Sequence, residues 1–538
     1  MLMDARRIAV SLRSGRRPRK LMALAALTVS ACASLPTDYP RPESFALTET
    51  RETLLGQAVG PLASFHAGDS GFKPLVSGLD AFVARMVLAE VAQKSLDVQY
   101  YIWQRDTTGR LLADALVRAA ERGVRVRVLL DDLGAPIGDD VLVALDAHEN
   151  IEVRLFNPVA LRSARGLGAL LDFGRVNRRM HNKSLTADNQ ATIIGGRNVG
   201  DEYFEARPDL DLGDIDVLAI GPVVEEASSA FDLYWNSAVA FPISALTNLR
   251  LPAEELAQRR EELRAYRESQ HGSAYAQALS NSQLAVQLRQ GDVPFFWGPA
   301  GLGYDHPNKV STAPTDTSTH LGPQLRKVID LTHQELLIVS PYFVPGKEGV
   351  EFFRSLRARG VTVKVLTNSL ASTDVGVVHA GYARYREPLL REGVELYEVK
   401  ATARLRDKGR NAEDNDKRGL TGSSRASLHA KTFAFDRTAV FVGSLNLDPR
   451  SVELNTEIGA LFQNPQAGEL FAEGFDVAAR EHAYRVEWKE RPGSGSGRLE
   501  WVSEENGREI RHTTEPNSSI WRRMGVWFMS LLPIESQL

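Results

Sequence analysis

The stretch RMHNKSLTADNQATIIGGRN occupies residues 179–198, and SLHAKTFAFDRTAVFVGSLN occupies residues 427–446. In both, a His is followed by Lys two positions later and by Asp seven positions later. An apolar run then leads to a turn of small residues that ends in Asn. Such a pattern does not readily arise twice by chance, so it indicates an internal duplication, which fixes the architecture before any single motif is interpreted.

The predicted elements around the two motifs follow one another in the same order. In the first half they are LDAFVARMVLAEVAQ, SLDVQYYIW, GRLLADALVRAAERG and VRVRVLL, and in the second PQLRKVIDLTH, ELLIVSPYFV, GVEFFRSLRARG and VTVKVLT. Gly123 and Gly360 end equivalent helices, as glycine does just after a helix. Strands that alternate with helices favour an α/β sheet covered on both faces. We therefore predict an α/β protein with two similar α-β-α sandwich halves, related by a pseudo-twofold axis, and one active site at their interface.

Changes in composition divide the rest of the chain around these halves. We expect the first half at residues 61–245 and the second at residues 301–485. The charged, helix-prone residues 246–300 connect them. A hairpin punctuated by GSGSG and ENG, followed by an apolar tail, is expected at residues 486–538.

The N-terminal residues resemble an export signal followed by a tether. Seven Arg or Lys residues and a single acid precede the segment LMALAALTVSAC, which is too short to span a bilayer. Residues 29–32, Val-Ser-Ala-Cys, resemble the bacterial lipoprotein box in which the cysteine is lipidated. We expect a signal peptide at 1–31, a lipidated Cys32 in the inner or outer membrane of a bacterial envelope, and an extended tether at 32–60. A plain signal peptide or an uncleaved anchor is the alternative.

The composition is that of a globular protein with enough apolar residues for a core. Of its 538 residues, 43% are apolar and 25% are charged, and the formal net charge is −4. Without residues 1–31, 57 basic residues face 67 acidic ones. An acidic body argues against a protein that grips nucleic acid, which requires clustered Lys and Arg. Cys32 is the only cysteine, which excludes an internal disulfide and a cysteine-based metal site.

The spacing of the motif residues places them in a common space. Side chains at positions i and i+2 of a strand share a face, so His181 points with Lys183, and His429 with Lys431. Metal binding is another interpretation of paired histidines. Each His, however, lies beside a Lys whose charge repels a cation, and no carboxylate cluster with ligand spacing accompanies them. We expect no metal.

If the pseudo-twofold axis brings the motifs together, the pocket fits a phosphate diester. Lysines and the amides of Asn198 and Asn446 would hold the non-bridging oxygens and stabilise the transition state. One neutral imidazole can attack phosphorus in line, while the other, protonated, gives its proton to the departing alcohol. These opposite protonation states require environments that push the two pKa values apart. Asp216 and Glu457, which each open an apolar strand, are candidates to orient an imidazole through its second nitrogen.

HNKSLTAD with GGRN, and HAKTFAFD with GSLNLDPRS, resemble the duplicated H-x-K-x4-D signature of the phospholipase D superfamily. The repeat pattern covers roughly residues 75–485. The runs GSLNLDPRSVELNTEIG and SPYFVP and the ending LLPIESQL are most similar to bacterial cardiolipin synthases and their relatives. The resemblance implies a covalent phosphohistidine intermediate formed without a cofactor. It suggests His181 as nucleophile and His429 as general acid, with Asp188 and Asp436 as supporting residues.

The first half departs from the pattern of the second at two positions. Gly196 stands where the second half has Ser444, so we expect its phosphate-facing turn to offer one hydroxyl fewer. Asp216 stands where the second half has Glu457, which makes the halves chemically unequal.

Two other segments leave alternatives open. His379 and Tyr382 lie in VVHAGYARYREPLL, where an aromatic stripe is typical of a helix core, although both could reach the substrate. The tail with Trp521, Trp527 and Phe528 could lie at a membrane interface or pack on the catalytic body, and it is too short to span a bilayer.

The expected function is that of a phosphatidyltransferase. A phosphatidyl group would pass from one phospholipid to His181 and then to the terminal hydroxyl of phosphatidylglycerol, producing cardiolipin. A phospholipase D, which releases phosphatidic acid because water is the acceptor, shares every step up to that point. The acidic body disfavours a nuclease, and the intact motifs disfavour a non-catalytic lipid-binding protein tethered to the membrane. The expected partners are phospholipids and a membrane surface, without nucleic acid or a cofactor; the donor, the acceptor and the oligomeric state stay open.

Overall fold

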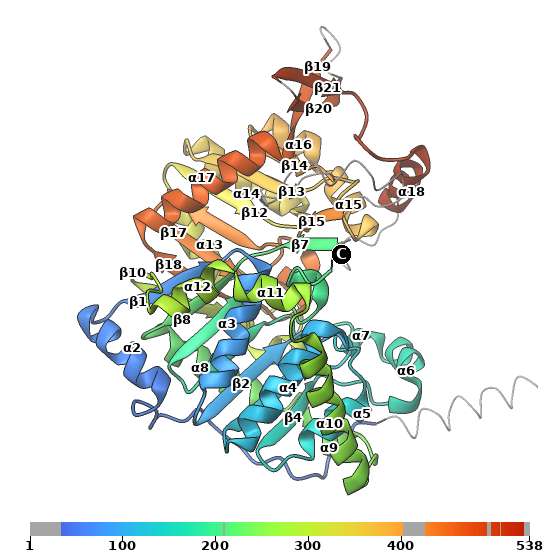
Figure 1. The fold of residues 1–538 in the computed structure, drawn as a ribbon. Helices are drawn as coiled ribbons and strands as arrows, with labels where there is room; N and C mark the ends of the chain where they lie inside the picture. Colours follow the sequence, from blue (N-terminus) through green and yellow to red (C-terminus); the bar gives the residue numbers. More distant parts are fainter. Residues whose placement is uncertain (1–33, 208–209, 402–424, 492–495, 506, 532–538) are drawn as a thin grey trace, which may run out of the picture.

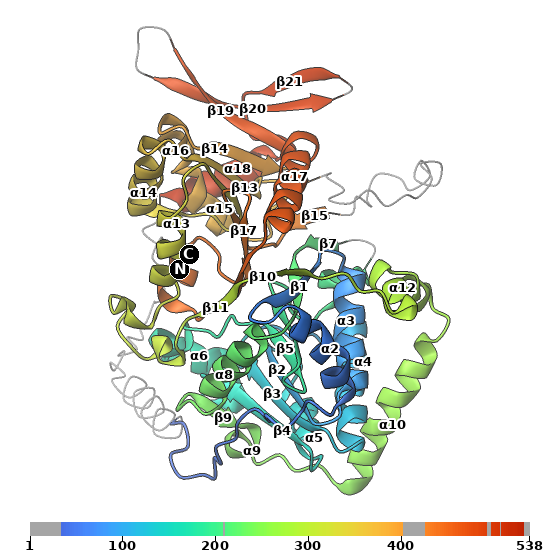
Figure 2. The same ribbon diagram turned by 90° about the vertical axis from the view of Figure 1, so that its left-hand side faces the viewer.

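The computed structural model describes residues 34–207, 210–401, 425–491, 496–505 and 507–531. Figures 1 and 2 show two α/β bodies stacked on each other, the first half below and the second above. The predicted signal peptide and Cys32 lie outside the described residues.

The first half is built on a nine-stranded mixed sheet. Its order is β10 (Phe296–Gly298), β1 (Ser70–Leu75), β8 (Asp216–Ile220), β6 (Ala191–Gly195), β5 (Ser184–Ala187), β2 (Ser95–Tyr100), β3 (Arg125–Asp131), β4 (Ile151–Phe156) and β9 (Ala240–Pro242). The central strands β2, β3 and β4 are parallel and almost fully buried. Such strands need cover on both faces. The helices α3 (Gly78–Val91) and α4 (Thr107–Glu121) supply it on one face, and α8 (Val223–Trp235) on the other (Figure 2).

The second half repeats this order in a ten-stranded sheet. The strands are β11 (Ala300–Tyr304), β18 (Ile458–Gln463), β17 (Ala439–Gly443), β16 (Thr432–Phe435), β12 (Glu335–Val339), β13 (Thr362–Asn368), β14 (Glu395–Val399), β19 (Ala483–Glu490), β20 (Gly497–Glu505) and β21 (Arg508–His512). The helices α14 (Gly346–Ala358) and α17 (Pro465–Glu481) lie on opposite faces (Figure 2). The series β1-β8-β6-β5-β2-β3-β4 matches β11-β18-β17-β16-β12-β13-β14, which confirms the predicted α/β class and its two similar halves.

The two halves share an apolar core where their sheets meet. Ile194 and Val217 of the first half belong to the same buried cluster as Val440, Val442 and Ile458 of the second. A two-stranded sheet adds a backbone connection, because β7 (Leu210–Gly213) pairs in parallel with β15 (Arg425–Leu428). The chain itself passes from the first sheet to the second between β10 and β11.

The residues between the halves contain three helices, α10 (Ala253–Gln270), α11 (Ala274–Ser280) and α12 (Gln283–Gln290). They pack on α3 and α4 of the first half. No helix among the described residues is long and apolar enough to cross a bilayer.

The segment expected as a tether is bound to the first half over its described part. Residues 34–53 contain no helix or strand, yet the Arg41 guanidinium donates to the Ser237 carbonyl at 2.9 Å and the Ala46 amide donates to Asp232 at 2.8 Å. The helix α2 (Leu54–Phe65) follows. This corrects the prediction, because a tether to residue 60 would be free of the body.

The C-terminal elements extend the second half. β20 and β21 form the predicted hairpin and continue its sheet beyond β19. The helix α18 (Ile520–Ser530) packs on α15 (Gly376–Ala383) through Val526. His379 and Tyr382 of α15 are buried, and they contact Arg386 at 2.9 Å and Glu398 at 3.1 Å. Their role is therefore structural.

Candidate active site

Backbone contacts between the halves place each motif histidine. The His181 amide donates to the Thr456 carbonyl at 2.8 Å, and the Thr456 amide donates back to Arg179 at 2.9 Å. In the second motif the His429 amide donates to the Gly213 carbonyl at 2.8 Å, at the end of the β7–β15 pair. Each histidine is therefore held beside the residue that precedes a carboxylate of the opposite half.

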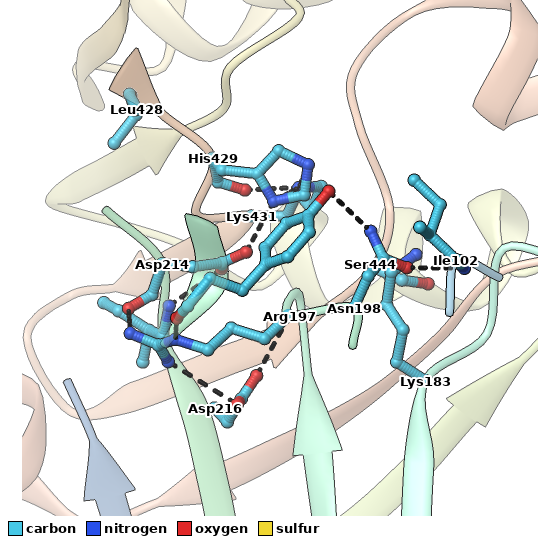
Figure 3. Close-up of polar contacts among 12 residues, drawn as sticks. Ile102, Lys183, Arg197, Asn198, Asp214, Asp216, Leu428, His429, Lys431 and Ser444 are labelled. Carbon is cyan, nitrogen blue, oxygen red and sulfur yellow. Dashed lines mark hydrogen bonds and ion pairs between the residues drawn. The ribbon is translucent and has the colours of Figure 1, made fainter. Parts of the chain in front are cut away.

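The two carboxylates complete a pair with each imidazole. His181 Nδ1 lies 2.9 Å from Glu457 Oε2, and His429 Nδ1 lies 2.6 Å from Asp214 Oδ2 (Figure 3 shows the second pair). Both carboxylates are fully buried. Because each carboxylate fixes Nδ1, the Nε2 of His181 is left to face a substrate, whereas the Nε2 of His429 also lies 3.3 Å from Lys431 Nζ.

Asp214, not the predicted Asp216, orients His429. The Asp216 carboxylate instead binds Arg85 Nη2 at 2.9 Å and the Arg197 amide at 3.1 Å. The strand registers explain the correction, since Gly195 faces Asp216 in the first half and the equivalent Gly443 faces Gly459 in the second. The counterpart of Glu457 is therefore two residues before Asp216. Aligning the strands after the motif, rather than taking the first acid on an apolar run, is the signal that would have found Asp214.

The turns next to the carboxylates differ by one hydroxyl, as the sequence indicated. This difference affects the carboxylates and not the face toward the substrate. The Ser444 hydroxyl donates to Glu457 Oε2 at 2.5 Å, so it positions that carboxylate rather than facing the substrate. In the first half, a Cβ on Gly196 would lie 2.3 Å from Asp214 Oδ1. Gly196 therefore leaves the space that the Asp214 carboxylate occupies.

Both motif lysines are buried with their histidines. Lys183 Nζ lies 2.5 Å from the His181 carbonyl, and Lys431 Nζ contacts the His429 carbonyl and lies 3.3 Å from His429 Nε2. Burial lowers the pKa of both ammonium groups, and Lys431 also lowers the pKa of Lys183 and of His181 in the opposite motif. This crowding of cationic groups is relieved when an anion binds among them.

The imidazoles and their carboxylates are electrostatically unequal. Burial, the two lysines and the other imidazole hold the His181 pKa well below its usual range. Burial raises the pKa of Glu457 to about 7, although Lys183 opposes it. In the second pair, burial and Lys431 lower the pKa of His429. Burial also opposes ionisation of Asp214, but Lys431 and His429 outweigh it and hold the pKa of this carboxyl below its usual range.

The predicted asparagines are placed differently from each other. Asn198 Oδ1 accepts from the Ile102 amide at 3.1 Å, and its Nδ2 donates to the Tyr203 hydroxyl at 3.0 Å, so its amide is used within the first half (Figure 3). Asn446 Oδ1 is buried and has no hydrogen-bond partner among the described residues. Asn446 therefore retains an unused polar atom, whereas Asn198 positions a tyrosine.

Two tyrosines of the first half border the imidazoles and were not found from the sequence. The Tyr101 ring lies edge-on to His181 at 5.1 Å between centroids, and Tyr203 lies edge-on to His429 at 5.3 Å. They limit how each imidazole can tilt. Neither belongs to a repeated motif, so only their contact with the histidines identifies them.

Asp188 and Asp436, expected within the catalytic motifs as supporting residues rather than proton carriers, lie away from the phosphate-facing atoms. Asp188 accepts from the backbone amides of residues 93–95 at 2.7–3.2 Å, and Asp436 accepts from residues 333–335 at 2.7–2.9 Å. In each motif a four-residue strand, β5 or β16, separates the Asp from the Lys and the His, so the Asp lies at the other end of that strand. Both aspartates therefore act in the fold.

The residue types at the site indicate whether it suits a metal ion or an anion. No group of three His, Cys, Asp or Glu side chains with the geometry of a metal site occurs in the part of the chain that the structure describes. The site instead combines two imidazoles with two buried lysines, and this set of residues suits an anionic group.

Comparisons with known proteins agree with this geometry. A family described as "Cardiolipin synthase, PLD-like domain" matches residues 88–235 and 325–478. Cardiolipin synthase C of Escherichia coli (strain K12) is 44% identical over 481 residues, which cover 89% of this chain and 99% of that protein. An uncharacterized protein of Helicobacter pylori (strain ATCC 700392 / 26695) is 32% identical and covers 95% of this chain and 98% of its own. The crystal structure of phosphatidylserine synthase from Haemophilus influenzae Rd KW20 has the same fold, with a TM-score of 0.51 at 13% identity, over 80% of this chain and 92% of its own.

Proposed function

Because the chain belongs to the family of cardiolipin synthases with PLD-like domains, we propose that it is a phosphatidyltransferase that forms cardiolipin through a phosphohistidine intermediate. The observation that carries the proposal is the pair of imidazoles, each bound through Nδ1 to a buried carboxylate of the opposite half. Two buried lysines beside them supply charge for the phosphoryl oxygens.

In the first step a phosphatidyl group moves to the enzyme. Neutral His181 donates its Nδ1 proton in a hydrogen bond to Glu457 and attacks phosphorus through Nε2. The P–N bond forms as the P–O bond to the departing alcohol breaks. His429, protonated and bound to Asp214, gives that oxygen its proton. Lys183 and Lys431 stabilise the charge on the non-bridging oxygens.

In the second step the phosphatidyl group moves to the acceptor. Neutral His429 takes the proton of the terminal hydroxyl of phosphatidylglycerol. The hydroxyl oxygen attacks phosphorus, the P–N bond breaks, and His181 is regenerated. The product is a diphosphatidylglycerol.

The unequal pairs support His181 as nucleophile and His429 as acid. A depressed pKa keeps His181 neutral, as an attacking nitrogen must be. Burial and Lys431 lower the pKa of His429 as well, but Asp214, whose pKa is below its usual range, stays ionised and opposes that shift in favour of the imidazolium that a general acid needs. A phosphodiester anion between the rings adds to this by raising the pKa of His429.

Mass spectrometry of lipids tests the reaction. The full chain is incubated with vesicles that contain labelled phosphatidylglycerol and one second phospholipid at a time. We expect labelled cardiolipin whose acyl chains identify the donor. Phosphatidic acid without cardiolipin would mean that water is the acceptor and that the protein is a phospholipase D.

We also propose that the protein is exported and anchored by a lipidated Cys32. The basic residues, the short apolar segment and the Val-Ser-Ala-Cys sequence support this. An anchor would hold the phosphate pocket near its lipids, on a bacterial membrane. Mass spectrometry of the N-terminal peptide tests it: a diacylglycerol adduct on Cys32 is expected, and an unmodified cysteine within an intact leader contradicts it.

A further inference from the structure

The helix α18 exposes large apolar side chains. Trp521 is 76% exposed, Trp527 65% and Phe528 62%, and Ile520 and Met524 are exposed with them. Only Val526 of this helix is buried, where it packs with Leu370 and Ala380. One side of α18 therefore belongs to the core, and the rest of its apolar surface is presented outward.

The first half has a comparable set on α6 (Arg165–Leu171) and α7 (Phe173–Val176). Leu170 is 72% exposed, Leu171 59% and Phe173 53%. Figure 1 places α6 and α7 at the right of the lower half and α18 at the right of the upper half. Apolar tips of both halves thus lie on the same side of the molecule.

The charge of these segments differs from that of the whole chain. The chain carries a formal net charge of −4, but α18 contains Arg522 and Arg523 and no acidic residue. Residues 161–178 contain four arginines and one aspartate, although Arg162 and Arg165 pair with Asp132 and Asp139 of the same half, so the net positive charge of this face comes mainly from α18. Apolar and aromatic residues flanked by arginine fit the interface of an anionic bilayer, in which aromatic rings lie at the headgroup level and guanidinium groups meet phosphate.

A series of contacts leads from α18 to the phosphate pocket. Arg522 donates to the Thr373 carbonyl at 2.9 Å, in the loop that follows β13. At the start of this loop, Asn368 accepts from the Leu428 amide at 3.0 Å and donates to the Leu428 carbonyl at 2.8 Å. Leu428 directly precedes His429. The helix is therefore tied to the backbone that carries the proposed general acid.

We propose that α18 together with α6 and α7 forms a docking surface for an anionic phospholipid bilayer, which presents lipid headgroups to the pocket between the halves. The proposal rests on the proposed function, because the bilayer is the source of both substrates. It adds to any anchor at the N-terminus a second attachment that orients the catalytic body.

Tryptophan fluorescence tests the docking directly. The chain has seven tryptophans, and those at positions 103, 235 and 501 are buried, whereas Trp521 and Trp527 project from α18. The full chain is reconstituted in vesicles of phosphatidylcholine and phosphatidylglycerol with brominated acyl chains. We expect quenching that falls by more than half in W521F/W527F and when phosphatidylglycerol is replaced by phosphatidylcholine. Quenching equal in the wild type and W521F/W527F would overturn the proposal.

Charge substitutions test the consequence for turnover. W527E/F528E on α18 and L170E/L171E on α6 should each lower turnover of vesicle lipids about tenfold. Both should leave turnover of a short-chain phosphatidylglycerol, dissolved as monomers, within twofold of wild type. Phe65, 85% exposed on α2 at the opposite side in Figure 1, provides the control F65E, which should change neither.

The outcomes separate docking from catalysis. Unchanged vesicle turnover in both double variants would overturn the docking surface while leaving the chemistry in place. His181→Ala should abolish turnover of both substrates and retain the quenching. A wild-type protein that is quenched but forms no cardiolipin would instead contradict the proposed function.

Discussion

The two halves build the same kind of imidazole–carboxylate pair from different atoms. The first half supplies Asp214 beside Gly196, which has no side chain, whereas the second supplies the longer Glu457 beside the hydroxyl of Ser444. The pKa of Asp214 lies below its usual range, while that of Glu457 is raised to about 7. The two imidazoles of the duplicated site are therefore suited to different roles. His429 faces a stable anion, whereas His181 faces a carboxyl that titrates near neutrality.

The largest expected effects come from the histidines themselves. His181→Ala and His429→Ala should each lower turnover by more than the ~10²- to 10⁴-fold usually associated with one acid or base. The two variants should differ in formation of the covalent intermediate from an aryl phosphodiester, because its leaving group needs no proton. His429→Ala should still form a phosphoryl-enzyme with it, detected by acid quench and mass spectrometry, and His181→Ala should not. A covalent adduct in His181→Ala alone would reverse the assignment.

The carboxylates should show the next largest effects. Glu457→Gln and Asp214→Asn keep the shape of each pair but remove its charge, and each should lower kcat on the order of 10²- to 10³-fold. With the aryl substrate, Asp214→Asn should recover most of the rate of adduct formation, since acid catalysis is dispensable there. Glu457→Gln should not. Equal recovery in both variants would show that the two pairs are interchangeable.

The turns beside the carboxylates give a smaller contrast. Gly196→Ala places a Cβ where Asp214 Oδ1 lies, so the carboxylate must move away from His429, and we expect a loss of about 10²-fold in kcat. Ser444→Ala removes a hydrogen bond to Glu457 and one accepted from the Ile458 amide at 3.0 Å but leaves the carboxylate in place, and we expect a loss of about tenfold. Circular dichroism first establishes that both variants are folded like the wild type. Measurement of kcat then shows which variant loses more activity. A larger loss in Ser444→Ala would contradict this account of the turns.

Much of the fold and part of the site were predictable from the sequence. The repeated strand–helix order and the i, i+2 spacing of His and Lys are local properties of the sequence. They therefore predicted two α/β halves and identified the two histidines and two lysines of the site. Asp214 was missed because Asp216 is the first acid on an apolar run, whereas aligning the strands of the two halves identifies the acid two residues earlier. Asp188 and Asp436 were grouped with the histidines because the motif joins them in sequence, although the strands β5 and β16 separate them in space. Tyr101 and Tyr203 have no signal at all apart from the tertiary contact.

The pH dependence of the first step should report Glu457. Below a pH of about 7 this carboxyl is protonated and donates to His181 Nδ1, so the imidazole proton lies on Nε2 and attack is blocked. Activity should therefore rise through a limb near 7 as the pH increases. Ser444 lowers the pKa of Glu457 by its hydrogen bond, so Ser444→Ala should move the limb upward by about one unit. A limb that Ser444→Ala leaves in place would assign the titration to another group.

The smallest expected effects on turnover concern Asp188 and Asp436, which clamp equivalent strand ends to different extents. Asp188 is fully buried, although two of its donor residues, Gln93 and Lys94, are exposed, whereas Asp436 is itself partly exposed. Loss of a buried acceptor leaves amides unsatisfied, so Asp188→Ala should lower the free energy of unfolding by roughly 1–3 kcal/mol. Asp436→Ala should lower the free energy of unfolding by less, since water can replace the carboxylate.

Both positions have a positive φ, of 50° and 49°, which Asn tolerates better than Ala, and Asn retains an acceptor. Asp188→Asn should therefore recover part of the loss in urea unfolding. Folded Asp188→Asn should turn over within a few-fold of wild type, and a loss comparable to that of Glu457→Gln would place this aspartate back among the groups that act on the phosphate.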